Sequence, residues 1–230
     1  MMKKMMKTTC ALAVLAASCN VMAESVDMRV TGAVTPIACK PVLDNNGIVD
    51  YGNINTNILS NDNYTFLPGK DISLTISCTA PAKIALLATS GRPGSTLSDY
   101  EEGPAGTAWP IARGAIPLGS GVAGLGMDGD KKIGAYTLLS VETKVDGESA
   151  KKIVSSDKLS WTGGSADSFF AQNGGIRYMT WFKDDIVEPV AFKNFTSKIR
   201  VLTYINKASE LDLTKPVKLD GQTNFEMFYL

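Results

Sequence analysis

The last stretch of the sequence, KLDGQTNFEMFYL (residues 218–230), decides the fold class. Its apolar residues Phe225, Met227 and Tyr229 alternate with polar ones, and a period of two is typical of a strand with one buried face. Chain ends fray unless tertiary structure holds them. The pattern therefore predicts that the chain ends on a strand paired within a sheet.

The same signature recurs along the chain between Gly, Asn, Asp and Pro turns. Strand composition or period is found at 26–34, 47–52, 71–79, 83–89, 135–147, 176–182, 198–208 and 216–230. In the third of these segments Cys78 shares a face with Ile72, Leu74 and Ile76, and the fourth is expected to be its hairpin partner after a turn at Pro81. Eight to ten strands without an 11-residue helical stripe indicate an all-β fold, one antiparallel β-sandwich.

The N-terminus, residues 1–23, matches a secretory signal peptide. Three lysines precede an apolar run too short to span a bilayer, and Val21 and Ala23 provide a cleavage site. The alternative is a lipoprotein-type cleavage that leaves a lipidated Cys19 on a membrane. The ordinary site just downstream is preferred, so residues 24–230 are predicted to be one exported domain.

Signal removal changes the charge and the cysteine count. The 23 basic and 23 acidic residues become 20 and 23, a net charge of −3, because three lysines leave. A weakly acidic protein lacks the positive surface of a nucleic-acid binder. Cys39 and Cys78 remain and enter an oxidising compartment, where a disulfide is expected. The rival interpretation, a metal site or a reactive thiol, needs further ligands, and the sequence has no histidine.

A long segment rich in Gly and Pro, residues 91–129, interrupts the strands. It is longer than ordinary connections and is interpreted as a functional excursion or a mobile loop, with a short strand or turn near 109–116. It contains GSGVAG (119–124) and GLGMDG (124–129), which match a dinucleotide fingerprint without the required strand and helix. DGD (128–130) lacks the full calcium-loop spacing. We therefore predict no cofactor and no metal.

Catalytic constellations are equally weak, and no catalytic residue is predicted. Without histidine, Ser-His-Asp and Cys-His arrangements cannot form. SAKK (149–152) and SSDK (155–158) fit Ser-x-x-Lys, but both lie in a polar stretch between strands and are interpreted as surface turns. The acidic pairs Glu101–Glu102 and Asp184–Asp185 are interpreted as solvated turns.

A group of aromatic residues leaves two interpretations open. Tyr178, Trp181, Phe182 and Trp161 could form a carbohydrate platform or fill the core. Packing is favoured, because large aromatic residues in a sheet are mostly buried.

Two family resemblances follow from these segments. VTGAVTPIACKP (30–41) resembles the first strand of chaperone/usher pilin subunits, in which a glycine, here Gly32, precedes the first cysteine by seven residues. LTISCTAP (74–81) looks like the strand with the second cysteine. The ending with penultimate Tyr229 is similar to the pilin strand that a periplasmic chaperone recognises. GIVDYG, LTISCTAP, KIGAYTL and PVKLDG…FYL together resemble the GltF-like family of enterobacterial periplasmic proteins of unknown function.

The pilin resemblance implies a fold and a mode of interaction. Pilins are immunoglobulin-like sandwiches that lack a last strand, and a neighbour fills the groove by strand addition. The resemblance implies a partner-binding edge at Phe225, Met227, Tyr229 and Leu230, with a periplasmic chaperone or fimbrial subunits as partners. It places the protein in the periplasm or on the cell surface, as a fimbria-like component.

A restriction and an alternative accompany this hypothesis. Too few residues precede the first predicted strand to donate a strand in turn, so the protein is expected to accept but not donate. In the alternative, the sandwich is complete in one chain, and the protein is a soluble periplasmic protein that binds an unknown ligand.

Overall fold

The computed structural model describes residues 27–163, 167–183 and 185–230. The chain forms two units, Met1–Thr35 and Pro36–Leu230. In the first unit the described residues, 27–35, contain neither helix nor strand. The predicted signal peptide and the alternative lipidation site Cys19 lie outside the described residues.

The second unit is all-β. Eight strands have five or more residues: β1 (Cys39–Leu43), β3 (Lys70–Ala82), β4 (Ile84–Ser90), β8 (Gly134–Val145), β10 (Lys151–Ser155), β12 (Tyr178–Phe182), β13 (Phe192–Ile205) and β14 (Thr223–Tyr229). Six have two residues: β2 (Thr65–Phe66), β5 (Ala123–Gly124), β6 (Met127–Asp128), β7 (Lys131–Lys132), β9 (Glu148–Ser149) and β11 (Thr162–Gly163). The helical segments of the described chain are the short 3₁₀ turns η1 (Asp44–Gly47), η2 (Thr56–Ile58) and η3 (Ala208–Glu210), and none of them could cross a membrane.

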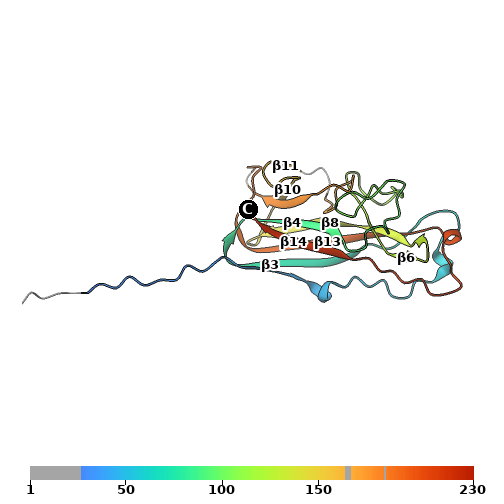
Figure 1. Cartoon of the computed structure of the whole chain (residues 1–230), viewed down its shortest axis with the longest axis horizontal. Helices are drawn as coiled ribbons and strands as arrows, with labels where there is room; N and C mark the ends of the chain where they lie inside the picture. Colours follow the sequence, from blue (N-terminus) through green and yellow to red (C-terminus); the bar gives the residue numbers. More distant parts are fainter. Residues whose placement is uncertain (1–26, 164–166, 184) are drawn as a thin grey trace, which may run out of the picture. The chain divides into compact units, whose positions relative to one another are not determined.

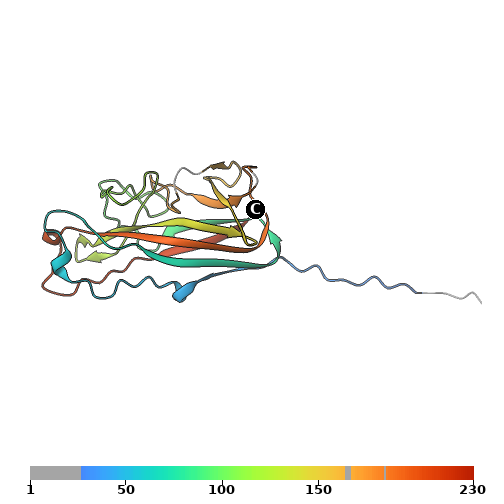
Figure 2. The same ribbon diagram turned by 180° about the vertical axis from the view of Figure 1, so that it is seen from behind.

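The strands form two antiparallel sheets and a small ribbon, β6–β7. The first sheet has the order β1-β3-β13-β8-β5, with β2 beside β13 and β9 beside β8. The second has the order β11-β10-β12-β4-β14. Figures 1 and 2 show the long strands of both sheets in two neighbouring layers. The all-β prediction with two antiparallel sheets is confirmed.

One hydrophobic core joins the inner faces of the two sheets. Trp181 of β12 packs on Phe195 of β13 with ring centroids 4.0 Å apart, and Phe192 lies 5.6 Å from Phe195. All three are buried, and each such side chain contributes about 1.5–3 kcal/mol by leaving water. Trp181 therefore fills the core, as the packing interpretation predicted.

A disulfide links the first sheet across its edge. Cys39 and Cys78 are direct cross-strand partners in the β1–β3 pair and are bonded. Cys78 is buried on the face that Ile72, Leu74 and Ile76 share. Both predictions for this strand are confirmed.

The predicted hairpin around Pro81 is wrong. Pro81 lies inside β3, and β4 belongs to the other sheet, so the chain crosses between sheets at Lys83. The pairing of β3 with β13 changes register between Phe192 and Asn194. A proline lacks the N–H of a regular ladder, and such an irregularity accommodates it.

Two further predicted strands are absent. Residues 27–38 contain no strand, and the first strand begins at Cys39. An alternating sequence favours a strand only where a neighbouring strand is available for pairing. Residues 48–52 also remain outside the sheets, because Asn45, Asn46 and Gly47 adopt left-handed φ angles of 46°, 53° and 77° and turn the chain away from β3.

The segment 91–129 packs against the first sheet. It contributes β5, which pairs with β8, and its Ala112, Ile116 and Val122 form a small cluster with Tyr204 of β13. The Tyr204 hydroxyl donates to the carbonyl of Leu97 at 2.7 Å. Residues 109–116 contain no strand but bend at 111 and 114–116, so the strand of the expected strand or turn is absent.

The glycines of this segment allow close backbone packing. A Cβ at Gly121 would collide with the carbonyl of Ala171, and one at Gly124 would collide with the backbone of Ser95. Neither GSGVAG nor GLGMDG opens a helix. Gly121 and Gly124 therefore serve the close packing of this segment.

Candidate functional site

An elongated groove lies between two segments of the second unit. One wall is formed by residues 43–59 and the other by residues 211–225; we call it the seam groove. It contains two cavities of about 270 Å³ and about 620 Å³, which we call cavity 1 and cavity 2. The two cavities share Val49, Tyr51 and Leu219 as lining residues.

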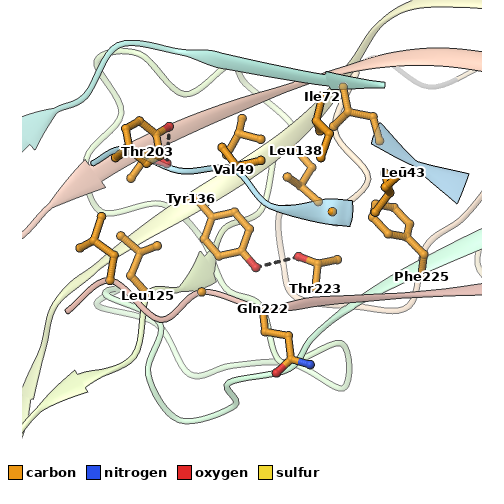
Figure 3. Close-up of a pocket in the computed structure, with 16 residues that line it drawn as sticks. Leu43, Val49, Ile72, Leu125, Tyr136, Leu138, Thr203, Gln222, Thr223 and Phe225 are labelled. Atoms are coloured by element: carbon orange, nitrogen blue, oxygen red, sulfur yellow. Dashed lines mark hydrogen bonds between the residues drawn. The ribbon is translucent and has the colours of Figure 1, made fainter. Parts of the chain in front are cut away.

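Cavity 1 has an apolar floor provided by the first sheet. Ile72, Leu138, Ile199 and Val201 form this floor, and Phe225 of β14 lies on the opposite side. Figure 3 shows Leu43, Val49, Leu138 and Phe225 around the cavity. No charged side chain lines it among the described residues. Burying apolar surface here would stabilise a bound group by about 25 cal/mol per Å².

Two hydroxyl pairs lie beside this floor. The Tyr51 hydroxyl donates to Thr203 Oγ1 at 3.1 Å, and the hydroxyls of Tyr136 and Thr223 are hydrogen-bonded at 2.7 Å (Figure 3). Burial raises the pKa of Tyr136 to about 12 and also raises the pKa of Tyr51. Both phenols are therefore neutral at physiological pH, and cavity 1 is uncharged.

Hydrogen bonds join the chain segments that flank the two walls at both ends of the seam groove. At one end the Cys39 N–H donates to the Tyr229 hydroxyl at 2.8 Å. At the other end the Ala208 N–H donates to the Ser60 carbonyl at 2.9 Å, and Ser209 Oγ donates to the Asn61 carbonyl at 2.7 Å. Between these ends, no main-chain hydrogen bond joins the two walls in the described part of the chain.

β14 is an edge strand along this groove. It pairs with β4 on one side, from Thr223 opposite Ser90 to Tyr229 opposite Ile84. Leu230 N–H donates to Lys83 at 3.0 Å and Gly91 N–H donates to Gln222 at 2.7 Å. Since hydrogen-bonded pairs alternate in an antiparallel ladder, the even-numbered residues of β14 bond to β4.

The odd-numbered residues of β14 therefore direct their backbone groups to the free edge. These residues are Thr223, Phe225, Met227 and Tyr229, and Phe225 and Met227 also pack against the core. The Phe225 ring meets buried Phe169 at 5.3 Å. Of the four residues predicted to form the partner-binding edge, Phe225, Met227 and Tyr229 have backbone groups on the open side and side chains on one face. Leu230 is different, because its N–H bonds to Lys83.

Contacts outside the groove hold β14 in place. Arg92 donates from Nε and Nη2 to the two carboxylate oxygens of Asp220, both at 3.0 Å, and this pairing lowers the pKa of Asp220. On the outer face, Phe228 makes an edge-to-face contact with Tyr178 with ring centroids 5.2 Å apart, and the Lys158 ammonium lies 4.2 Å from the centroid of the Phe228 ring. β14 is therefore held along the side that pairs with β4 and on its outer face.

The Ser-x-x-Lys motifs form no nucleophile–base pair. Ser155 Oγ donates to Asp157 at 2.8 Å, and the Lys158 ammonium lies over aromatic rings. In the other motif, Ser149 is exposed and Lys152 is ion-paired with Asp167.

The acidic motifs also have structural contacts. Glu102 accepts the N–H groups of Gly94 and Thr96 at 2.6 and 2.8 Å. Asp128 pairs with Lys215 at 3.1 Å. Asp185 pairs with Lys151, whereas Asp184 lies outside the described residues. No cluster of potential metal ligands occurs among the residues that the structure describes.

Sequence reasoning missed the walls of the seam groove. A signal was present in residues 211–219, where Leu211, Leu213, Val217 and Leu219 are apolar at odd positions. Val49 and Tyr51 alternate in the same way, but this pattern predicts a strand at 47–52 and not a wall of the groove.

Comparisons with known proteins place these features in context. The family described as "Protein of unknown function (DUF1120)" matches residues 28–137. Two proteins of Escherichia coli (strain K12) are similar over nearly their whole length. The uncharacterized protein YhcF is 26% identical over 220 residues, 90% of each chain. Protein GltF is 25% identical over 252 residues, 96% of this chain and 95% of GltF. No solved structure matches. The predicted relation to GltF is confirmed.

Proposed function

We propose, from the similarity of residues 28–137 to the DUF1120 family, that this chain is an exported, fimbria-like interaction protein that accepts a β-strand along β14. The single observation that carries the proposal is the free edge of β14 beside an apolar groove. Strand addition obtains affinity from main-chain hydrogen bonds and specificity from pockets for alternate side chains. The seam groove offers both.

The strand order supports this proposal. We assign the order β1-β3-β13-β8 to strands A-B-E-D of an immunoglobulin fold and adjacent β4 and β14 to C and F; β10, β11 and β12 have no counterpart in this assignment. In a complete immunoglobulin sheet a strand G follows F. In the described chain no strand occupies that position beside β14. An incoming strand would take the place of strand G.

The neighbouring edge is less suited to accept a strand. β1 borders the groove near Tyr229 but carries Lys40 and Pro41. Lysine and proline are residues with which natural proteins protect edges. β14 contains neither between Thr223 and Tyr229. The partner is therefore expected to pair with β14.

The proposal does not include the expectation that the protein cannot donate a strand. That expectation depended on a first strand at residues 26–34, but the first strand begins at Cys39. The described residues 27–38 are outside the sheets. A periplasmic chaperone or a fimbrial subunit remains the proposed partner, and the periplasm or cell surface the proposed location.

A peptide-binding experiment tests strand acceptance. The probe is a 13-residue peptide that alternates valine with threonine, and its control carries a central proline. Met227→Pro removes an N–H that faces the free edge, whereas Met227→Ala removes the same side chain and keeps the N–H. The peptide should bind the wild type and Met227→Ala, and should slow amide hydrogen exchange at Phe225 and Tyr229.

Two results would contradict the proposal. Met227→Pro should bind at least tenfold more weakly than Met227→Ala, since about 1.4 kcal/mol is one order of magnitude and a lost hydrogen bond is worth about that much. Equal binding by the two variants would place the peptide elsewhere. If the peptide did not slow amide hydrogen exchange on β14, it would also have to bind elsewhere. Export is tested separately by intact-mass analysis. The exported protein should have the mass of residues 24–230, with Glu24 as its first residue.

A further inference from the structure

The seam groove has an uneven distribution of charge. Cavity 1 is uncharged, whereas Asp50, Lys215 and Lys218 line cavity 2. The rest of cavity 2 is mostly aliphatic, and its buried residues include Ile133, Ile205 and Leu211. The two cavities adjoin at Val49 and Leu219. An elongated ligand with an apolar end and a charged end would match this distribution.

The sign of the charged end follows from the pairing of these three groups. The Asp50 carboxylate accepts the N–H of Gly52 at 2.7 Å. Lys215 is already paired with Asp128 at 3.1 Å and Asp212 at 3.7 Å. Lys218 forms no ion pair within the described chain, although it lies near enough to lower the pKa of Asp220. Asp220 itself is engaged by Arg92, so Lys218 is the cation of cavity 2 that has no ion pair within the described chain, beside the carboxylate of Asp50 that the Gly52 N–H stabilises.

We infer that the seam groove binds a single-chain alkyl carboxylate, with its alkyl chain in cavity 1 and its carboxylate beside Lys218 in cavity 2. The combined space suits such a ligand, because small-molecule pockets of about 300–1,000 Å³ are mostly apolar with few polar groups. The inference does not depend on strand acceptance, since it uses the floor and walls of the groove and not the backbone of β14.

A head-group series on the full mature chain tests this inference. Dodecanoate, dodecanol and dodecyltrimethylammonium each have a chain of twelve carbon atoms and differ in charge. Calorimetric titration below their solubility limits and micelle concentrations measures each affinity. The carboxylate should bind most tightly and the ammonium most weakly. The affinities of the carboxylate and the ammonium should differ by about two- to fivefold for each exposed charge contact. Extending octanoate to dodecanoate should raise affinity by up to about fourfold per buried methylene.

A charge-reversal pair locates the head group. Lys218→Glu should weaken dodecanoate binding and strengthen binding of the ammonium. Lys193→Glu makes the same charge change on β13, and Lys193 does not line either cavity. It should leave both affinities unchanged.

Three results would overturn the inference. They are no calorimetric signal for dodecanoate at 1 mM, equal affinity for the carboxylate and the ammonium, or equal effects of Lys218→Glu and Lys193→Glu. The first two use the wild-type protein, so a misfolded variant cannot decide the outcome. Loss of peptide binding in Met227→Pro with intact dodecanoate binding would separate this inference from strand acceptance.

Discussion

Proline substitution at adjacent positions of β14 should distinguish its paired side from its free side. Glu226 is opposite Leu87 and belongs to the even-numbered set that bonds to β4. Glu226→Pro removes the N–H that the Leu87 carbonyl accepts. Leu87 is only 6% exposed, so water cannot replace that donor. Leaving a buried acceptor without a partner costs about 1–3 kcal/mol.

Met227→Pro should behave differently although it is one residue away. Its N–H faces the free edge, so proline removes no hydrogen bond to β4, and proline is tolerated on edges of this kind. Its remaining cost is the loss of a partly buried side chain, which Met227→Ala reproduces.

Chemical denaturation followed by tryptophan fluorescence measures both differences. We expect Glu226→Pro to be less stable than Glu226→Ala by about 1–3 kcal/mol. We expect Met227→Pro and Met227→Ala to agree within about 0.5 kcal/mol. Equal penalties for proline at the two positions would refute the assigned register and, with it, the free edge.

Three further predictions concern the disulfide, the glycine-rich segment and a buried phenol. Replacing Cys39 and Cys78 by serine should lower the free energy of unfolding by about 4 kcal/mol, because the bond closes a separation of 39 residues; reduction of the wild type should reproduce the loss. Gly121→Ala should cost about 1–3 kcal/mol through its clash with a backbone carbonyl, while Gly163→Ala, in open space, should be nearly neutral in the same denaturation assay. The pKa of Tyr136 is about 12 in the folded protein and about 10 in the unfolded chain, so the unfolded state loses its proton first and stability should fall as pH rises from 10 to 12; Tyr136→Phe should show a weaker decline.

The parts of the fold that could be predicted depend on local pattern. β3 and β14 have a period of two and lie in sheets, and Cys78 faces the core with its alternating neighbours. The disulfide followed from the expected compartment. These properties need no knowledge of which strands are neighbours.

The parts that could not be predicted depend on tertiary pairing. Residues 47–52 alternate as a strand does, but the left-handed turn at Asn45 and Asn46 carries them away from the edge of β3. The seam groove brings together segments far apart in sequence. The bond that closes one end joins Cys39 to Tyr229 across 190 residues. A single sequence gives no information on such a contact, so the groove could not be located.

The glycine-rich segment illustrates a different limit. Its glycines match a phosphate-binding fingerprint, yet the space beside Gly121 is filled by the carbonyl of Ala171. Close approach of a backbone requires glycine whether the backbone belongs to a ligand or to the protein itself. The motif therefore predicts that another group approaches these glycines closely, but it does not show whether that group belongs to a ligand or to the protein.

The edges of the two sheets differ in how they are protected. In the first sheet β1 carries Lys40 and Pro41, and the opposite edge ends in the two-residue strand β5, which belongs to the segment 91–129. In the second sheet β11 is also only two residues long. Short strands, prolines and lysines are the usual protections against unwanted pairing. β14 has seven residues and none of these protections, and its single charged residue, Glu226, is exposed. An unprotected edge of this length would favour aggregation unless a specific partner covers it, and this is the physical reason to expect a partner strand at β14.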